Sequence, residues 1–578
     1  MTVAVQASSA SSHPGTGGLL VSPETRRALE SLRPLLGSDP EADQLFRGRP
    51  YEYPGPEDPR RPAIECTTDD LEGLELNDAF APELREVLSR ISPAWIAGLV
   101  DAAILQSAPE RILADAASAR EPLIHAPPPA LAELRVPALC LQRLIDAVDA
   151  DARRLALDFD QRVFRASALL ATDLQGHALH PDVSRATAAE TAELLALEDR
   201  ASSDAPSQHR RALLARDYSR RCRYARAVAL AARTLATERA VDLRALYRAF
   251  DAVAGLDKAP FRRGPSEYLT PEFLAEMAVE FYHSLRDPHH VVTFLLLTFP
   301  IKNSSGLRTN VTTEAADAGE LLMLAQLRRL LEFLRALGLP NVRFVCLTDG
   351  IVYSRYLGPY DRLQAVYYRE NVRHFRNVLG LAGRVLIVDA DPVLRRIAGF
   401  ENLLRHAHTV LEVAAQAHPN VSRKLLSLTR SFLFHIHAYD ADRVLLARIV
   451  NAGLRGELLD EPRDRLEQNR IWKKAAYDAR WYAAHLIVMA AIGGVARLVK
   501  SRVIRATVHP KAGQYAPAPV NVRDFTDLPY HRKPLLKAGA NPLNLDTYIG
   551  ANLWADPERR FVDVYLGGNR SPFLAVQL

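Results

Sequence analysis

Three short runs of β-branched and large apolar residues constrain the fold of this 578-residue chain more than any other feature. They are VVTFLLLTF at 291–299, VRFVCL at 342–347 and RVLIVDA at 384–390. Uninterrupted runs of this kind are typical of strands that are buried on both faces. The segments between them, near 317–336 and 361–379, have helical periodicity. This alternation predicts an α/β fold with a Rossmann-like, mostly parallel sheet.

The composition changes near residue 260, which predicts a boundary between domains. Residues 1–20 are rich in Ser, Gly and Ala and are expected to form a disordered tail. Residues 21–260 are predicted to form a mainly helical N-terminal domain, because Ala, Leu, Arg and Glu dominate and LRALYRAFDAV has helical spacing. Residues 261–578 are predicted to form an α/β catalytic domain. Thr270 and Pro271 mark the start of its first helix, and 502–510 and 560–568 resemble further strands.

The overall charge and the cysteine pattern exclude several classes of protein. A net charge of +5 on a chain this long argues against a dedicated nucleic-acid binder. The cysteines are widely scattered and form no CxxC pair, which predicts neither a zinc knot nor a disulfide framework. No signal peptide is evident, and the most apolar stretch, 481–496, is shorter than a membrane span. We therefore expect a cytoplasmic protein with no membrane or nucleic-acid partner. The four cysteines are Cys66, Cys140, Cys222 and Cys346.

Polar residues that follow the first predicted strand form one candidate cluster. The segment FPIKNSSGLRTN places Lys302 and Arg308 around a flexible loop, where two cations can hold a phosphate or a carboxylate. A solvated loop explains this segment equally well. The next helix begins with Asp317 and Glu320, whose spacing puts both carboxylates on one face of its first turn. Compensation of the helix dipole is the more ordinary role for either carboxylate alone.

Two further clusters follow other predicted strands. Asp349 comes directly after the second strand in LTDGIVY, where it either faces the cleft or makes an Asx turn. In IRATVHPKAGQY, alternation puts Arg505 and His509 on one face of a strand, and Lys511 is close by. His531 lies in the following segment, DLPYHRKP. A lone histidine is more often structural, whereas four basic groups in two adjacent segments can bind an anion and move protons.

The same clusters carry a resemblance to a known family. FPIK, the basic Asn/Gly-rich loop, DxxE, TDGIVY, the Tyr367–Tyr368 pair, IRATVHPK and PYH occur in this order between about residues 285 and 578. This ordered set resembles the pyoverdine/dityrosine biosynthesis family, which includes isocyanide synthases. The sequence departs from the family pattern at three positions, where the family usually has Lys, Arg and Trp. These are Arg308, Ile351 and Tyr530.

The resemblance implies a reaction without metal or nucleotide cofactor. In it, the α-amine of an amino acid condenses with the ketone of ribulose 5-phosphate, and one sugar carbon stays on nitrogen as an isocyanide. A related branch of the family makes N-formyl amino acids, and an inactive ligand-binding scaffold of the same fold is a third interpretation. Downstream biosynthetic enzymes are candidate partners. The candidate catalytic residues are Lys302, Asp349, His509, Glu320 and His531, and the candidate substrate-binding residues are Arg308, Asp317, Arg505, Lys511 and Tyr353.

Two other patterns favour ordinary structure over function. HIHAYDAD at 435–442 contains a His-x-His pair and two aspartates, but it continues a helical run, on which residues two apart point to different faces. The Arg-rich stretch 210–248 fits a solvated helix face better than an RNA-binding surface. No phosphate-binding loop or GxSxG motif occurs, so the sequence offers no nucleotide site or serine nucleophile.

Overall fold

The structure is a computed structural model, and it describes a large part of the chain in separate stretches. These are residues 5–6, 71–72, 74–77, 84–101, 132–136, 223, 226–238, 241–258, 270–298, 316–348, 359–394, 396–433, 470–507, 534–537, 546–547, 561–566 and 574–577.

The described helices and strands alternate through the second half of the chain, as the apolar runs predict. In chain order they are β1 (Val5–Gln6), α2 (Leu84–Arg90), α3 (Pro93–Asp101), β2 (Ala132–Val136), a helix over 226–236, α8 (Leu243–Lys258), α9 (Pro271–Arg286), β3 (Val292–Leu297), α10 (Ala318–Ala336), β4 (Val342–Thr348), α12 (Pro359–Val378), β5 (Val385–Asp389), α13 (Ala390–Leu394), α14 (Phe400–Ala417), α15 (Pro419–Leu433), α18 (Arg470–Ala491), the 3₁₀ turn η5 (Val495–Leu498), β6 (Val503–Thr507), β7 (Pro534–Lys537), β8 (Asp546–Thr547), β9 (Phe561–Leu566) and β10 (Leu574–Gln577).

A four-stranded sheet in the order β5-β4-β3-β6 is the centre of the fold. All three pairings in it are parallel. The segments 291–299, 342–347 and 384–390 were predicted to be strands of one parallel sheet, and this is confirmed. Across the sheet, the strands are the third, second, first and fourth of the four in chain order. β3, the first of the four in the chain, therefore lies between the second, β4, and the last, β6.

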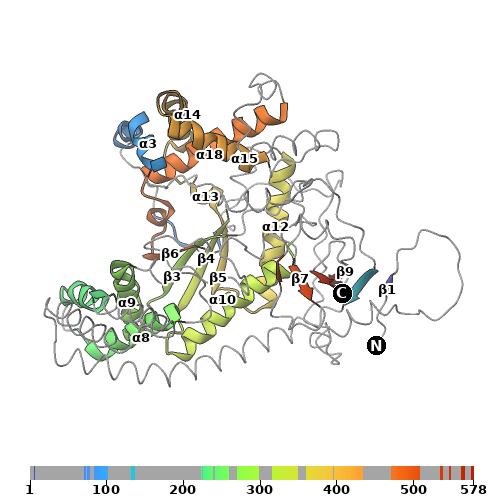
Figure 1. The fold of residues 1–578 in the computed structure, drawn as a ribbon. Coiled ribbons are helices and arrows are strands. Elements are labelled where there is room, and N and C mark those ends of the chain that lie inside the picture. Colours follow the sequence, from blue (N-terminus) through green and yellow to red (C-terminus); the bar gives the residue numbers. More distant parts are fainter. Residues whose placement is uncertain are drawn as a thin grey trace, which may run out of the picture.

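Helices cover both faces of this sheet (Figure 1). On one face α8, α9, α10 and α12 pack against Phe294, Phe344 and Ile387 in one apolar core. On the other face α2, α3, α14, α15 and α18 pack against Leu295, Val345 and neighbouring residues in a second core. Successive strand residues point to opposite faces, so an unbroken apolar run is needed to serve both cores. The two cores make this a three-layer α/β/α arrangement.

Helix α9 begins where its sequence predicts. Thr270 is extended and its hydroxyl accepts a hydrogen bond from the Phe273 N–H at 3.2 Å, while Pro271 occupies the first turn. The cap satisfies one of the N–H groups that a helix start leaves without a partner, and proline has no N–H to lose there. The predicted cap and first turn are confirmed.

A second, six-stranded sheet has the order β1-β2-β9-β10-β7-β8 and includes antiparallel pairs. Strand β9 confirms the strand expected within 560–568. Strand β2, whose five residues pair in parallel with β9, lies in the N-terminal half and was not predicted from the sequence. The partner of β2 lies more than four hundred residues away in the chain. A strand that depends on such a distant partner need not have a local sequence pattern that predicts it. The position of the domain boundary near residue 260 stays a prediction.

The layer of α15 and α18 contains a buried carboxyl group at Asp478. Its side chain is fully buried, and Lys474, one turn earlier on α18, donates to both of its oxygens at 2.5 and 2.7 Å. Burial raises the pKa of Asp478 to about 6, although the hydrogen bond from Lys474 acts in the opposite direction. The folded protein therefore holds a proton on Asp478 at a pH at which the unfolded chain has released it.

We predict that Asp478→Asn removes a pH dependence of stability. Between its ordinary value of 3.8 and about 6, native Asp478 binds more protons than the unfolded chain, so the free energy of unfolding falls as the pH rises through this window. Asparagine does not titrate, so the variant does not lose stability in this way. Urea unfolding should show that the free energy of unfolding of the variant increases relative to that of the wild type as the pH rises to about 6. Above that pH the difference between the two proteins should stay constant. A difference that is constant with pH would contradict the prediction.

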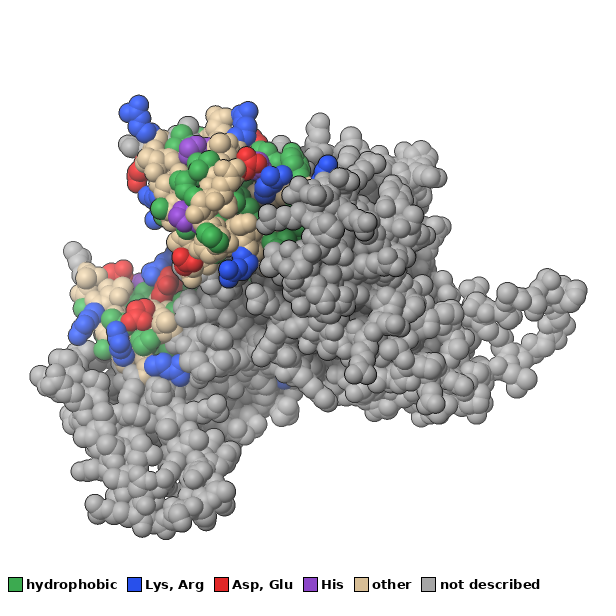
Figure 2. Space-filling model, turned by 45° about the horizontal axis from the view of Figure 1, so that its top comes forward, with side chains coloured by type: hydrophobic (Ala, Val, Ile, Leu, Met, Phe, Trp, Pro, Cys, Tyr) green, Lys and Arg blue, Asp and Glu red, His purple; other side chains and the backbone are tan. Residues whose placement is uncertain are grey.

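The surface of the helical layers is chemically mixed. Figure 2 shows cations, carboxylates, histidines and apolar side chains interspersed over the coloured part of one face. Opposite charges that alternate in this way create no strong field of one sign on that part of the face. Within the described stretches, no helix is long and apolar enough to cross a membrane.

Candidate active site at the carboxyl edge of the sheet

The four parallel strands all end at one edge of the sheet. Leu297 of β3 is paired with both Leu347 of β4 and Thr507 of β6, and Thr348 of β4 is paired with Asp389 of β5. In open α/β sheets, ligands bind outside the carboxyl ends of the strands, at the point where the strand order reverses. Here that point lies between β3 and β6.

The last row of side chains at this edge is polar on the face covered by α10 and α12. The rows before it are apolar, with Leu296, Cys346 and Ile387 in the core. One step further along the same face stand Thr298, Thr348 and Asp389, which are 3%, 1% and 1% exposed. The core therefore ends in three buried polar groups on neighbouring strands. The hydroxyls of Thr298 and Thr348 have no hydrogen-bond partner within the described part of the chain.

The first turn of α10 brings Asp317, Glu320 and Tyr368 together on this side. Asp317 caps the helix by accepting from the Gly319 N–H at 2.8 Å. Glu320 Oε2 accepts from the Asp317 N–H at 2.6 Å, which completes a capping box. Glu320 Oε1 accepts from the Tyr368 hydroxyl of α12 at 2.9 Å. Glu320 and Tyr368 are 0% and 1% exposed, so a carboxyl group and a phenol meet in a dry environment.

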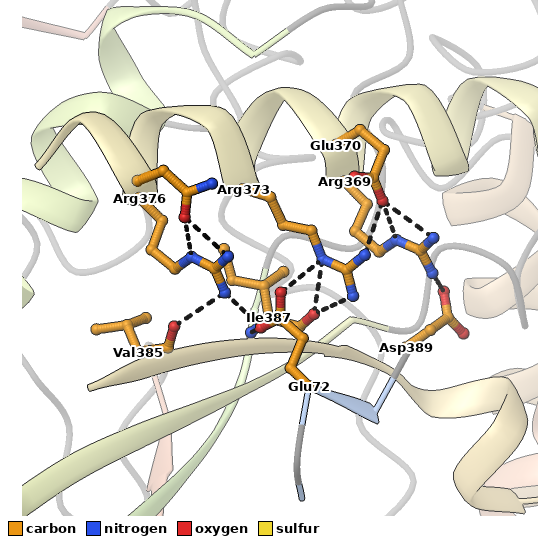
Figure 3. Close-up of polar contacts among 9 residues, drawn as sticks. Glu72, Arg369, Glu370, Arg373, Arg376, Val385, Ile387 and Asp389 are labelled. Carbon is orange, nitrogen blue, oxygen red and sulfur yellow. Dashed lines mark hydrogen bonds and ion pairs between the residues drawn. The ribbon is translucent and has the colours of Figure 1, made fainter. Parts of the chain in front are cut away.

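Asp389, the third member of the polar row, is paired with α12. The Arg369 guanidinium lies 3.5 Å from Asp389 Oδ2 and 3.1 Å from Glu370 Oε1. Figure 3 shows Arg369 between these two carboxylates. Arg369 and Asp389 are both buried, and a buried arginine persists only where carboxylates surround it. The pairing fixes α12, and with it Tyr368, against the end of β5.

Glu72 fixes the other end of α12 against the free edge of β5. Its carboxylate pairs with Arg373 at 3.1 Å and with Arg376, and it accepts from the Ile387 N–H at 2.7 Å (Figure 3). Arg373 donates to the Ile387 carbonyl at 2.8 Å, and Arg376 donates to the Val385 carbonyl. These side chains occupy the backbone groups that an edge strand otherwise offers to another strand. The cluster is a support for the sheet, because each charge in it meets an opposite charge.

The opposite face of the same edge carries an exposed apolar side chain. Leu297 is 54% exposed although β3 is an interior strand, so none of the described helices covers the sheet at this point. Arg505 of β6 belongs to this face, since it is paired with Leu295. Its guanidinium donates to the Gly493 carbonyl at 2.9 Å. A Cβ atom at Gly494, where φ is +89°, would lie only 2.5 Å from Arg505 Nη2, so glycine admits the arginine here.

The structure places three of the ten predicted site residues. Asp317 and Glu320 lie together at the start of α10, in the capping geometry that is their ordinary role. Arg505 lies on the other face of the sheet and contacts the turn after α18, so it is not brought together with them. The assignments of the remaining seven stay predictions, because these residues lie outside the described stretches. They are Lys302, Arg308, Asp349, Tyr353, His509, Lys511 and His531, and HIHAYDAD at 435–442 lies there too.

Four residues of this edge were not singled out from the sequence. Thr298, Thr348 and Asp389 each lie within one residue of the end of an apolar run, so a recognisable signal exists for them: a polar residue at the end of a buried strand. Tyr368 belonged to the Tyr367–Tyr368 motif but had no assigned role. Its partner Glu320 is distant in the chain, and only the packing of α10 on α12 brings the two together.

Two features limit the chemistry of the described residues. Cys346 is fully buried beneath the polar row, and burial raises the pKa of its thiol far above the ordinary value, so it is a packing residue rather than a nucleophile. No group of three or more His, Cys, Asp or Glu side chains in the described stretches is arranged to hold a metal ion.

Comparisons with known proteins support the resemblance over part of the chain. Residues 283–430 match the family model described as "Pyoverdine/dityrosine biosynthesis protein". No curated protein matches the chain. Among solved structures, the PvcA protein from Pseudomonas aeruginosa matches with 15% identity and a TM-score of 0.33, over 50% of this chain and 84% of that chain. Over residues 283–430, which contain β3, β4, β5 and the helices between them, this chain resembles the pyoverdine/dityrosine biosynthesis family.

Proposed function

We propose that this protein is a biosynthetic enzyme of the isocyanide synthase type, which joins the α-amine of an amino acid to ribulose 5-phosphate. One observation carries the proposal. Three segments with predicted site residues, Lys302, Asp349 and His509, directly follow the ends of β3, β4 and β6. These are neighbouring strands of one parallel sheet, so the three segments start side by side at one edge. The family match over 283–430 supports the same assignment.

The strand order supports a Rossmann-like description of the domain. The order β5-β4-β3-β6 reproduces the order 3-2-1-4 of a doubly wound sheet. In such sheets the chain leaves neighbouring strands in opposite directions and opens a crevice between them. The crevice predicted between β3 and β6 has the exposed side chain of Leu297 on one face and the polar row on the other. This division suits a substrate pair that combines an apolar amino-acid side chain with a polar sugar phosphate.

The proposed reaction needs anion-binding and proton-transfer groups. The amine adds to the ketone carbon, and the carbinolamine then loses water to form an imine. An isocyanide carbon is bonded to nitrogen alone, so both carbon–carbon bonds of the former ketone carbon must break. The atoms balance without an oxidant when the one-carbon side leaves as formaldehyde, the phosphate leaves as inorganic phosphate and the remaining three carbons leave as a hydroxycarbonyl compound. Each of these steps moves a proton. We assign anion binding to Lys302, Arg308, Arg505 and Lys511, with Asp317 and Tyr353 as further substrate contacts, and proton transfer to Asp349, His509, Glu320 and His531.

A direct assay tests the proposal. Purified protein is incubated with ribulose 5-phosphate, labelled at its ketone carbon, and each of the twenty amino acids in turn. Mass spectrometry then follows the label. We expect one or a few amino acids to give a labelled isocyanide. Absence of labelled product with all twenty would reject the proposal.

The same assay separates the N-formyl alternative. A formamide differs from the corresponding isocyanide by one molecule of water, so the masses distinguish the two products. Quenching at neutral pH avoids acid hydrolysis of the isocyanide to the formamide. If the protein binds both substrates and releases neither product, the inactive scaffold becomes the better description.

We predict that Tyr368→Phe reduces kcat by at least about tenfold, because positioned proton-transfer groups contribute roughly 10²–10⁴ to rates. The Tyr368 hydroxyl donates to buried Glu320 at 2.9 Å, so its loss removes a proton path to a candidate acid/base and leaves one carboxylate oxygen with a missing donor. The free energy of unfolding should fall by about 1–3 kcal/mol at the same time.

Tyr282→Phe is the matched control for this variant. Tyr282 is also buried, and its hydroxyl accepts from the Asp242 N–H at 3.0 Å and from Arg286 at 2.8 Å. It lies on α9, away from the predicted crevice. We expect this control to lower stability while kcat per folded molecule stays unchanged. Equal kcat values for both variants and the wild type would remove Tyr368 from the reaction.

A further inference from the structure

Two neighbouring threonine hydroxyls of the polar row have no hydrogen-bond partner within the described stretches. Thr298 and Thr348 are 3% and 1% exposed, and the Oγ1 atom of each is buried without a hydrogen-bond partner in the described part of the chain. Buried hydroxyls nearly always have a partner, and exceptions are concentrated where a ligand or an ordered water completes the bonding. Two such exceptions stand next to each other here.

The register of the sheet places the two hydroxyls side by side. Leu297 is paired with Leu347, and the Thr298 N–H donates to the Leu347 carbonyl at 3.2 Å, so Thr298 and Thr348 are the next pair along. Alternation from Leu296 and Cys346 puts both on the face of α10 and α12. Neighbouring strands lie about 4.8 Å apart. Since O–H···O bonds are about 2.7–2.8 Å long, a single oxygen atom between the two hydroxyls can bond to both.

The charges beside this pair favour a neutral oxygen as the occupant. Asp389 is the next residue in the row and is a carboxylate, and the nearby guanidinium of Arg369 is already paired with it and with Glu370. Threonine hydroxyls donate neutral hydrogen bonds. A phosphate placed here would meet the Asp389 carboxylate, whereas a hydroxyl or carbonyl oxygen would not be repelled.

We propose that Thr298 and Thr348 together bind one carbonyl or hydroxyl oxygen of the ketose substrate and so position the sugar at the carboxyl edge of the sheet. The inference rests on the proposed function and identifies which end of the sugar phosphate enters this part of the site.

Threonine-to-valine substitutions test the inference, because valine keeps the shape and removes the hydroxyl. No described group bonds to these hydroxyls, so Thr298→Val, Thr348→Val and the double variant should have Tm values equal to or above that of the wild type. The double variant should lose at least about tenfold in affinity for ribulose 5-phosphate, measured by calorimetry, and in kcat/KM. Thr298→Ser and Thr348→Ser retain the hydroxyl and should retain most of both.

Thr293→Val is the matched control on the same strand. Thr293 is 1% exposed, and its hydroxyl accepts from Arg343 Nε at 2.9 Å, so this variant should lower Tm and leave the affinity for ribulose 5-phosphate unchanged. A double valine variant that binds ribulose 5-phosphate like the wild type, or that loses as much Tm as Thr293→Val, would overturn the inference, since the hydroxyls would then serve the fold through a trapped water. A wild-type protein that binds the ketose without converting it would reject the proposed function, while the calorimetric comparison would still decide the inference. A wild type that does not bind the ketose rejects both.

Discussion

Glu72→Ala is expected to lower the free energy of unfolding by about 3–5 kcal/mol, which is the typical cost of removing one partner from a buried ion pair. This is a large part of the stability of an ordinary domain. Thermal and urea unfolding measure the change directly.

The reason lies in how many groups depend on this one carboxylate. Glu72 pairs with Arg373 and Arg376 of α12 and accepts from the Ile387 N–H of β5. The side chains of Arg373 and Arg376 are 13% and 9% exposed. Water can therefore solvate their charges only weakly once the carboxylate of Glu72 is removed. The Glu72 backbone has a φ of 47°, a left-handed conformation that is costly for any residue except glycine. Such a conformation persists where surrounding contacts over-determine it.

Two variants serve as controls for this prediction. Glu75→Ala removes a carboxylate that is 75% exposed and 3.5 Å from Lys500, and exposed pairs contribute only about 0–1 kcal/mol. Glu72→Gln keeps the shape and the acceptor for Ile387 but loses the charge, so its stability should fall between those of the wild type and Glu72→Ala. If Glu72→Ala proves no more damaging than Glu75→Ala, the edge of β5 does not depend on this cluster.

The parallel sheet and the helix starts could be predicted from the sequence because their signals are local. Strands that face two cores must be apolar at every position, and 291–299, 342–347 and 384–390 have that pattern. Likewise, Thr270 with Pro271 and Asp317 with Glu320 are short motifs whose hydrogen bonds close within one turn. In each case the residues that form the sequence pattern are the same residues that make the stabilising contacts.

The features that escaped prediction depend on partners far along the chain. Glu72 meets Arg376 and Ile387 across some three hundred residues, and nothing near Glu72 in the sequence announces an ion pair. Strand β2 needs β9 in the same way. The pairing of Glu320 with Tyr368 needs both α10 and α12 in place. Tertiary packing decides such contacts, and local patterns do not record them.

The sequence predicts where the candidate site lies better than it predicts which residues belong to it. Polar residues after buried strands predict an edge, and the described strands end at one edge as expected. Arg505 illustrates the limit of the argument, because alternation assigns a side chain to one of two faces and does not say which face carries the chemistry. It lies on the face opposite to Glu320 and binds the Gly493 carbonyl. A single arginine can hold both a backbone carbonyl and a substrate anion, so its proposed role in binding is open to test.

Lys302→Ala is expected to reduce kcat/KM by at least about tenfold. Lys302 follows the end of β3, an interior strand whose last residues are fixed by pairing with β4 and β6. We assign the Lys302 ammonium to the sugar phosphate or to the reacting carbonyl oxygen. A charge-assisted contact contributes about 1.5–3 kcal/mol, and each 1.36 kcal/mol corresponds to about tenfold in rate.

The kinetic parameters distinguish the two roles of Lys302. If the ammonium binds the phosphate in the ground state, KM for ribulose 5-phosphate should rise while kcat changes little. If it stabilises charge that develops on the carbonyl oxygen, kcat should fall instead. Lys500→Ala controls for the loss of one cation, because Lys500 is 66% exposed and paired with Glu75. Lys302→Arg keeps the charge with a different geometry and should recover ground-state phosphate binding better than it recovers kcat. Kinetics of Lys302→Ala that match both Lys500→Ala and the wild type on a confirmed substrate would remove Lys302 from the site and weaken the proposed function with it.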